Sequence, residues 1–291
     1  MHLFCFGMGF SAQHLAASLD RKAWTIAGTV RDADAAQVLR FGGIEAFVYD
    51  GAQRNDALVA SLTRATHLLL SIPPGAAGDP VLRHYGDDLA NAPDLKWIGY
   101  LSTVGVYGDH DGAWIDETTA CAPISERSRR RFAAEQEWLD FASTSGKRVV
   151  LFRLAGIYGP GRSAIDTVRS GRARRVIKVG QSFNRIHVAD IARVCLASMQ
   201  GRGNAPIYNV ADDEPAPPQD VIAHAATLLN LPLPPAIPFD EAELSPMAAS
   251  FYGENKRVRN NLMKCELGVT LAYPTYREGL AALAAMARAA E

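Results

Sequence analysis

The stretch HLFCFGMGFSA, residues 2–12, decides the fold of this chain. Its first five residues, His2 to Phe6, form a short apolar run that is typical of a buried strand. Gly7 ends this run, and residues 10–19 then place their apolar side chains on roughly one face of a helix. The chain therefore opens with a strand, a tight glycine turn and a helix.

The turn between these two elements has the spacing of a phosphate-binding loop. Gly7-x-Gly9-x-x-Ala12 matches the pattern G-x-G-x-x-G/A. In that pattern the first glycine permits the tight turn, the second lets the backbone approach a pyrophosphate, and the third small residue allows close packing. The helix that starts at Phe10 would add unpaired N–H groups. We expect Gly7, Gly9, Phe10 and Ala12 to bind a dinucleotide; the alternative is a glycine turn that binds nothing.

Apolar runs and helical stretches continue to alternate beyond this turn. Five further strands are expected, at Trp24–Val30, Ile44–Tyr49, His67–Ile72, Trp97–Ser102 and Val149–Leu154. A helix is expected from Asp34 to Arg40, and AAEQEWLDFA (residues 133–142) favours another directly before the last strand. Strands that alternate with helices form right-handed βαβ units. The sequence therefore predicts an α/β fold with a doubly wound parallel sheet.

The C-terminal third predicts a second, smaller lobe. Its prolines fall into two groups, residues 215–218 and 232–238, around a helical stretch at Gln219–Leu229, and a last helix is expected at Tyr276–Ala290. We expect residues 1–160 to form the dinucleotide-binding domain, with 185–212 returning to it. Residues 161–184 and 213–291 would then form a substrate-binding lobe at the carboxyl edge of the sheet. No obvious flexible linker separates the two lobes, so we expect them to share an interface.

Composition excludes several classes of protein. The 291 residues are 48% apolar and 21% charged, which suffices for a sizeable core, and the net charge of −1 gives no general attraction to nucleic acid or an anionic membrane. No apolar run approaches the ~18–20 residues of a spanning helix, and the opening segment lacks the features of a signal peptide. The four cysteines lie far apart, which argues against a metal site or a disulfide framework. We expect a cytoplasmic protein without metal that acts on a small molecule.

The end of the second expected strand bears on which dinucleotide binds. An acidic residue there would bond the ribose 2′-hydroxyl of NAD, whereas an arginine accommodates the 2′-phosphate of NADP. Because a guanidinium matches a phosphate, Arg31 favours NADP over NAD. Asp32 could still serve a ribose, or both side chains could simply be solvated. Asp50, after the third strand, could reach the adenine, although Asp-Gly is also ordinary turn chemistry.

Several motifs give the chain a resemblance to a known family. Besides the glycine turn they are LSTVGVYG (101–108), DET (116–118), RLAGIYGPG (153–161), RIHVADIA (185–192) and YNV (208–210). In this order they resemble the short-chain dehydrogenase/reductase superfamily, in particular its extended branch, the NAD-dependent epimerase/dehydratase family. The resemblance implies a Rossmann-type fold with an NAD or NADP cofactor. It also implies a homodimer through helices that flank the central strands, although an Arg-rich helix start leaves the oligomeric state open.

The family uses a Ser or Thr, a Tyr and a Lys, of which this chain keeps the first. The resemblance implies that Thr103 occupies the Ser/Thr position. The family's segment P-x-x-x-Y-x-x-x-K-x-x-x-E maps onto Pro123 to Glu135, with Arg127 at the Tyr position and Arg131 at the Lys position. Arginine stays protonated at neutral pH and cannot replace tyrosine as a proton donor. The chain is therefore identified as an atypical member of the family.

Two interpretations of Arg127 and Arg131 remain open. Four residues apart on one helix face, they could clamp a carboxylate or phosphate of the substrate or cofactor. Alternatively they belong to a solvated face on which Arg131 pairs with Glu135. Tyr107, close to Thr103 in sequence, is a candidate replacement for the proton donor, with a packing role as the alternative.

Other titratable or charged residues are weaker candidates. Asp116, Glu117 and His187 could donate a proton, but His187 precedes a helix start and is more typical of a structural residue. Arg162 could touch the substrate or stabilise its own turn.

The sequence thus predicts an atypical NADP-dependent oxidoreductase or epimerase-like enzyme. Its substrate would be small and polar or anionic, in the manner of a sugar nucleotide, with Thr103, Tyr107, Arg127 and Arg131 as the catalytic candidates. Two alternatives follow from the missing Tyr and Lys. One is a non-catalytic NADP(H)-binding redox sensor or regulator, and the other is a scaffold that binds a different metabolite.

Overall fold

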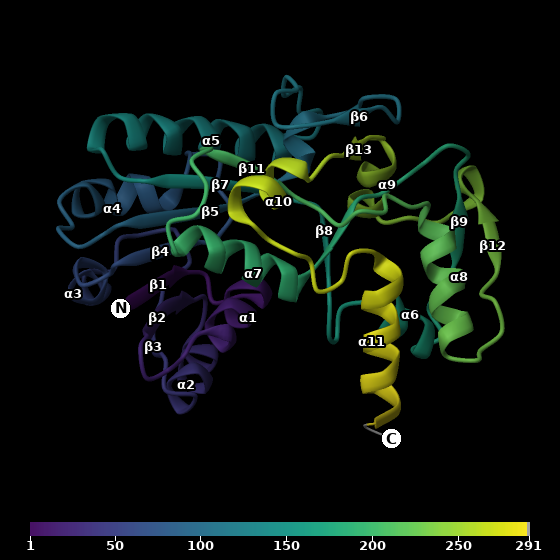
Figure 1. Ribbon diagram of the computed structural model, residues 1–291, viewed down its shortest axis with the longest axis horizontal. Helices are drawn as coiled ribbons and strands as arrows, with labels where there is room; N and C mark the ends of the chain where they lie inside the picture. Colours follow the sequence, from purple (N-terminus) through teal and green to yellow (C-terminus); the bar gives the residue numbers. More distant parts are fainter. Residues whose placement is uncertain (290–291) are drawn as a thin grey trace.

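Seven parallel strands form the central sheet of the computed structural model, which describes residues 1–289 (Figure 1). They are β1 (His2–Phe6), β2 (Thr25–Val30), β3 (Glu45–Val48), β4 (His67–Leu70), β5 (Trp97–Thr103), β7 (Val149–Leu154) and β11 (Ile207–Val210). Their order in space is β11-β7-β5-β4-β1-β2-β3, and every neighbouring pair is parallel. The chain starts mid-sheet, winds to one edge and crosses back to the other. The predicted doubly wound α/β sheet is confirmed.

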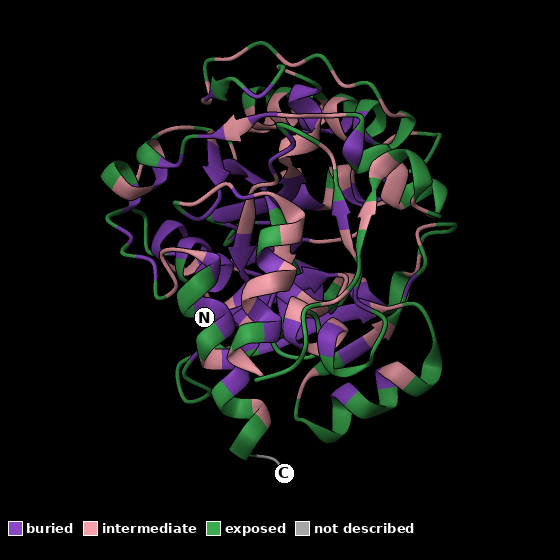
Figure 2. Cartoon of the chain, turned by 90° about the vertical axis from the view of Figure 1, so that its right-hand side faces the viewer, coloured by how far each residue is buried: buried purple, intermediate pink, exposed green. Residues whose placement is uncertain are grey.

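Helices cover both faces of this sheet because its strands are apolar on both sides. Along β1, Leu3 and Cys5 pack into one core while Phe4 and Phe6 pack into the other. The first core lies under α1 (Phe10–Ser18), α2 (Ala33–Phe41) and α7 (Val188–Met199). The second lies under α3 (Val59–Thr63), α4 (Pro80–Ala90) and α5 (Glu126–Ser145). Figure 2 shows the buried residues gathered in the strands, with exposed residues on the outer helix faces.

Helix α5 begins earlier than the apolar pattern indicates. The expected stretch 133–142 lies in the middle of the helix, which runs from Glu126 to Ser145. Ser125 caps the start, because its hydroxyl oxygen accepts a hydrogen bond from the N–H of Ser128. Gly146 ends the helix in the left-handed conformation. This longer helix is what carries positions 127 and 131 to the carboxyl edge of the sheet.

A second lobe with a core of its own stands at one end of the molecule (Figure 1). It is built from α6 (Ala164–Arg169), β9 (Arg175–Ile177), α8 (Pro218–Leu228), β12 (Ala236–Pro238), η3 (Phe239–Glu241), α9 (Pro246–Tyr252) and α11 (Tyr276–Ala289). Helix α11 approaches β8 (Gly156–Tyr158) closely, since a Cβ at Gly279 would lie 2.1 Å from the Tyr158 hydroxyl. Ala290, the expected end of the last helix, lies outside the described residues.

Segment 254–258 ties this lobe to the sheet domain. Asn255 donates its N–H to Asp109 Oδ1 (2.6 Å), and its carbonyl accepts from the N–H groups of His110 and Gly112. Its side chain holds the lobe, because Oδ1 accepts from Ser182 N (3.1 Å) and Nδ2 donates to the Gly180 carbonyl (3.0 Å). Strand β13 (Arg257–Val258) then pairs with β6 (Trp114–Ile115). Segment 254–258 is therefore hydrogen-bonded to both lobes and connects them.

The remaining short elements complete the connections. They are η1 (Asp56–Leu58), η2 (Val104–Tyr107), β10 (Arg185–His187) and α10 (Asn261–Leu267). Within residues 1–289, the helices lack the combination of length and hydropathy that crossing a bilayer requires.

Candidate functional site

The backbone conformation and the packing of the fold require a glycine at position 7 but not at position 9. Gly7 has φ +92°, and a Cβ there would lie 2.8 Å from Ile72 Cγ2, so the turn requires glycine. Gly9 has φ −84°, a value open to any residue, and no atom lies within 4 Å of the place a Cβ would occupy. The chain's own packing therefore does not explain a glycine at position 9. The open space beside it fits a ligand that approaches the backbone.

The start of α1 faces the same space. Gly9 is the N-cap of α1 and supplies no side-chain acceptor, and the first turn of the helix carries no acidic residue. Ala12 is fully buried, which lets the helix pack closely on the sheet. The ring of Phe10 lies 5.9 Å from the Arg162 guanidinium, so the 159–162 turn stands next to the glycine turn. A phosphate at this place would meet free backbone N–H groups.

The two charged residues after β2 have different roles. The Asp32 carboxylate caps α2 by accepting a hydrogen bond from Ala35 N at 2.8 Å. Arg31 is exposed, and its side chain forms no hydrogen bond or ion pair with any residue that the structure describes. Asp50 accepts a hydrogen bond from Ala52 N (2.8 Å), which is the ordinary turn chemistry of Asp-Gly. Of these three, Arg31 is the one whose functional group is uncommitted.

Thr103 ends β5 and caps the short helix η2. Its Oγ1 accepts a hydrogen bond from Gly105 N at 3.1 Å. Among the described residues no acceptor takes its hydroxyl proton, so the hydroxyl can still donate to the oxygen of a ligand. Strand register sets Thr103 beside Leu154 at the carboxyl edge of β7.

Tyr107, the candidate proton donor, lies in the interior. It is 0% exposed, and its hydroxyl donates to Asn209 Oδ1 at 2.8 Å. The Arg153 guanidinium lies 4.7 Å from the centre of its ring. Burial raises the pKa of Tyr107 to about 12. These contacts favour the packing alternative for Tyr107 over proton transfer to a substrate.

The two arginines at the Tyr and Lys positions lie on α5 without a carboxylate partner. Arg131 donates from Nη1 to the Tyr100 hydroxyl and to the Leu101 carbonyl, both at 3.1 Å. Arg127 is exposed, and its guanidinium lies 5.2 Å from the ring of Phe251 in the opposite lobe. Neither forms an ion pair within residues 1–289. Both charges are therefore uncompensated by the residues that surround them.

The alternative in which Arg131 pairs with Glu135 is wrong, because Glu135 forms its ion pair with a different arginine, Arg153. Glu135 is 0% exposed, and its Oε2 accepts from Nη2 of the buried Arg153 at 2.8 Å. Arg153 Nε lies 3.2 Å from each carboxylate oxygen, and Ser102 donates its hydroxyl proton to Oε1. The pair thus joins α5 to β7 and, through Ser102, to the residue of β5 that precedes Thr103. Sequence reasoning noted Arg153 only within a motif, although a lone charge in the apolar run VVLFRL signals a buried partner.

The weaker candidates have structural contacts. Asp116 accepts from the N–H and hydroxyl of Thr118, and these hydrogen bonds hold its pKa below the usual range. Glu117 accepts from Asn209 N at 2.8 Å. His187 caps α7 through Nδ1, which accepts from Ala189 N, and burial lowers the pKa of His187 to about 4.

The chain is similar to several known proteins. The profile of the NAD dependent epimerase/dehydratase family matches residues 88–211. A solved structure of a functionally unknown conserved protein from Silicibacter pomeroyi DSS is 50% identical, covers 98% of this chain and 99% of that one, and superposes with a TM-score of 0.87. Protein YeeZ of Escherichia coli K12 is 28% identical over 217 residues, which are 70% of this chain and 75% of YeeZ.

A more distant structure shares the fold. UDP-glucuronic acid 4-epimerase from Bacillus cereus, solved in complex with NAD, is 16% identical with a TM-score of 0.75. The match covers 100% of this chain and 99% of the epimerase.

The buried Glu135–Arg153 pair gives a stability prediction. Glu135→Leu leaves the Arg153 charge buried without a partner, which should lower the free energy of unfolding by about 3–5 kcal/mol. Urea unfolding followed by circular dichroism measures this loss. The double variant Glu135→Leu/Arg153→Met removes both charges and should regain most of it.

Arg130→Ala, on the exposed face of the same helix, is the control and should leave the transition in place. A double variant as unstable as the single one would show that the charge itself is not the cause.

Proposed function

This chain belongs to the NAD-dependent epimerase/dehydratase family, and we propose that it is an NADP-preferring oxidoreductase or epimerase-like enzyme for a small anionic substrate. The observation that carries the proposal is the glycine turn. Gly9 borders open space that the chain's own side chains leave free, at the start of a helix without a side-chain cap.

The residues around this space fit a dinucleotide. Gly7, Gly9, Phe10 and Ala12 would hold the pyrophosphate at the start of α1 through backbone N–H groups. Asp50, at the end of β3, stays our candidate for the adenine side. A nicotinamide dinucleotide bound there supplies a hydride donor or acceptor. The B. cereus epimerase, complexed with NAD on the same fold, supports this choice of cofactor.

The contacts that Asp32 makes, and that Arg31 lacks, support NADP over NAD. The Asp32 carboxylate caps α2, so it is not free to accept a hydrogen bond from a ribose hydroxyl. Arg31, next to it, keeps an exposed guanidinium that can form charge-assisted hydrogen bonds to a 2′-phosphate.

The substrate end of the site is cationic. Arg127 and Arg131 have no carboxylate partner among the described residues, and they lie one turn apart on α5. Since neither can release a proton at neutral pH, their role would be to bind and orient a carboxylate or phosphate and to stabilise negative charge. Thr103 would donate its free hydroxyl proton as a hydrogen bond to a substrate oxygen. These roles do not require Tyr107 to leave its hydrogen bond to Asn209.

The absence of a proton-transferring tyrosine favours one alternative, a non-catalytic NADP(H)-binding sensor. Arginines stand on α5 where the family's segment has its Tyr and Lys, and arginine does not exchange a proton at neutral pH. The two functions differ in turnover, because only the enzyme would oxidise NADPH in the presence of a substrate.

Gly9→Val should abolish cofactor binding and spare the fold. The valine side chain enters the open space, so affinity for both NADPH and NADH should fall by about tenfold or more, a loss of about 1.4 kcal/mol or more. Fluorescence titration measures binding, and thermal unfolding checks the fold. Gly86→Val on α4, where a Cβ also meets no atom within 4 Å, is the matched control. Retained affinity in Gly9→Val would place the nucleotide elsewhere.

Arg31→Ala should discriminate between the two cofactors. Loss of a charge-assisted contact of roughly 1.5–3 kcal/mol weakens NADPH binding by about 10- to 150-fold and leaves NADH binding unchanged. Parallel titrations with both nucleotides measure the difference. Equal losses for NADPH and NADH would remove the preference for NADP.

A carbonyl panel tests catalysis and the arginine pair together. NADPH oxidation is followed with matched substrates that carry a carboxylate or its neutral amide, and only the acids should react. Arg127→Gln and Arg131→Gln should raise KM for the acids by about tenfold or more, since each removes a cation from the site. Tight NADPH binding with no oxidation by any member of the panel would favour the sensor.

A further inference from the structure

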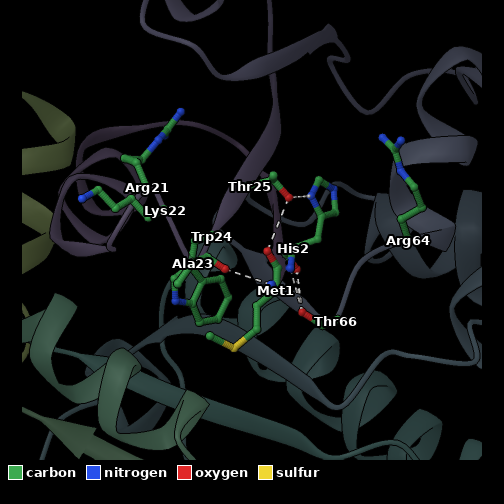
Figure 3. Close-up of a pocket in the computed structure, with 9 residues that line it drawn as sticks. All are labelled: Met1, His2, Arg21, Lys22, Ala23, Trp24, Thr25, Arg64 and Thr66. Carbon is green, nitrogen blue, oxygen red and sulfur yellow. Dashed lines mark hydrogen bonds between the residues drawn. The ribbon is translucent and has the colours of Figure 1, made fainter.

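A second recess lies at the amino edge of the sheet, opposite the glycine turn. Two adjoining cavities of about 430 and 450 Å³ share five lining residues, His2, Arg21, Trp24, Thr25 and Arg64. We call the two together the amino-edge groove. His2 and Thr25 are the first residues of β1 and β2, and the other three come from the turns before β2 and β4 (Figure 3).

Positive charge dominates the lining of this groove. Arg21, Lys22 and Arg64 contribute three cationic side chains, and Glu45 is the one carboxylate among the lining residues. That carboxylate is already engaged, because its Oε2 accepts from Ser61 Oγ at 2.7 Å and from Arg64 at 3.2 Å. The groove therefore has two cationic side chains in excess of its one carboxylate.

The floor of the groove is neutral and fixed. The Ser61 hydroxyl donates its proton to Glu45. In the hydrogen bond between His2 Nε2 and Ser61 Oγ, the imidazole is therefore the donor. His2 Nδ1 then carries no proton and accepts a hydrogen bond from the Thr25 hydroxyl. Burial lowers the pKa of His2, which keeps this imidazole neutral. Trp24, 8% exposed, packs at 4.8 Å from the His67 ring and forms a rigid apolar wall. The groove is therefore a preformed recess with an uncharged floor and cationic side chains around it.

Not every cation of the groove is available to a ligand. Arg21 donates from Nη2 to the Gly43 carbonyl, directly after the C-terminus of α2, where a cation also offsets the helix dipole. Lys22 has no such task, since its ammonium forms no hydrogen bond or ion pair within the described part of the chain. In Figure 3 Lys22 and Arg21 extend from one turn, while Arg64 stands across from them.

We propose that the amino-edge groove binds a phosphate-bearing small molecule, at a site separate from the dinucleotide. Arginine and lysine on opposite sides of a recess suit an anion with more than one negative oxygen, and the volume lies in the range of small-molecule sites, roughly 300–1,000 Å³. Strands β1 and β2 run from the groove to Gly7 and Arg31, a span on the order of 15–20 Å. One bound phosphate group cannot serve both ends.

Calorimetric titration of the full chain with inorganic tripolyphosphate at constant ionic strength tests the proposal. Wild type and Gly9→Val should bind with equal affinity, because the glycine turn is not involved. Lys22→Glu should weaken binding by about tenfold or more without shifting thermal unfolding, since Lys22 has no described side-chain contact to lose. Arg64→Gln should weaken binding as well.

Arg172→Glu is the control, because it makes the same charge reversal on an exposed residue of the other lobe. No binding to wild type overturns the proposal. So does a loss in Gly9→Val, which would place the anion at the glycine turn, or a loss in Arg172→Glu equal to that in Lys22→Glu. These outcomes are independent of whether the protein binds NADPH.

Discussion

The buried ion pair between Glu135 and Arg153 holds the centre of this molecule together. It fastens the middle of α5 to β7, and the hydroxyl of Ser102 adds β5 to the same contact. A carboxylate and a guanidinium without access to water must stay paired, because either one alone would be a costly buried charge. The pair therefore fixes which face of α5 turns toward β5 and β7 at this point. Everything that α5 presents to the carboxyl edge depends on this pair.

What α5 presents there is charge without a partner. Had Glu135 been free, it would have neutralised Arg131 one turn earlier on the helix. Since Arg153 occupies it, Arg131 turns instead to two neutral oxygens, on Tyr100 and Leu101. The chain thus retains the glutamate of the family's segment, Glu135. At the Tyr and Lys positions of that segment it carries two cations, Arg127 and Arg131. That combination suits recognition of an anion, whereas the proton relay of the family needs a group that titrates.

Local patterns in the sequence were enough for the fold, since buried parallel strands are apolar runs separated by helices. β11 is the exception, because its four residues include a buried asparagine, and the sequence indicated it only as a motif. The apolar pattern alone marks only residues 133–142 of α5, because the helix begins with a hydroxyl cap at Ser125 and a charged first turn. The glycine turn could be predicted because its constraint lies within six residues.

Contacts between distant residues could not be predicted in this way. The hydroxyl of Tyr107 is bonded to Asn209, 102 positions away, and nothing near Tyr107 in sequence reveals its burial. Asp32 caps α2 through a contact only three residues away, at Ala35. Its position at the end of the second strand, however, is equally compatible with a contact to a ribose. The amino-edge groove is assembled from turns around residues 21–25, 43–45 and 64–66, which only the folded sheet brings together.

We propose that the open space beside Gly9 and the free guanidinium of Arg31 form one NADP site. Fluorescence titration of the unmodified protein with NADPH and, separately, with NADH tests it most directly. We expect both nucleotides to bind, NADPH clearly more tightly than NADH. Failure of both to bind would contradict it, and would mean that the glycine turn keeps the shape of a cofactor site without its use.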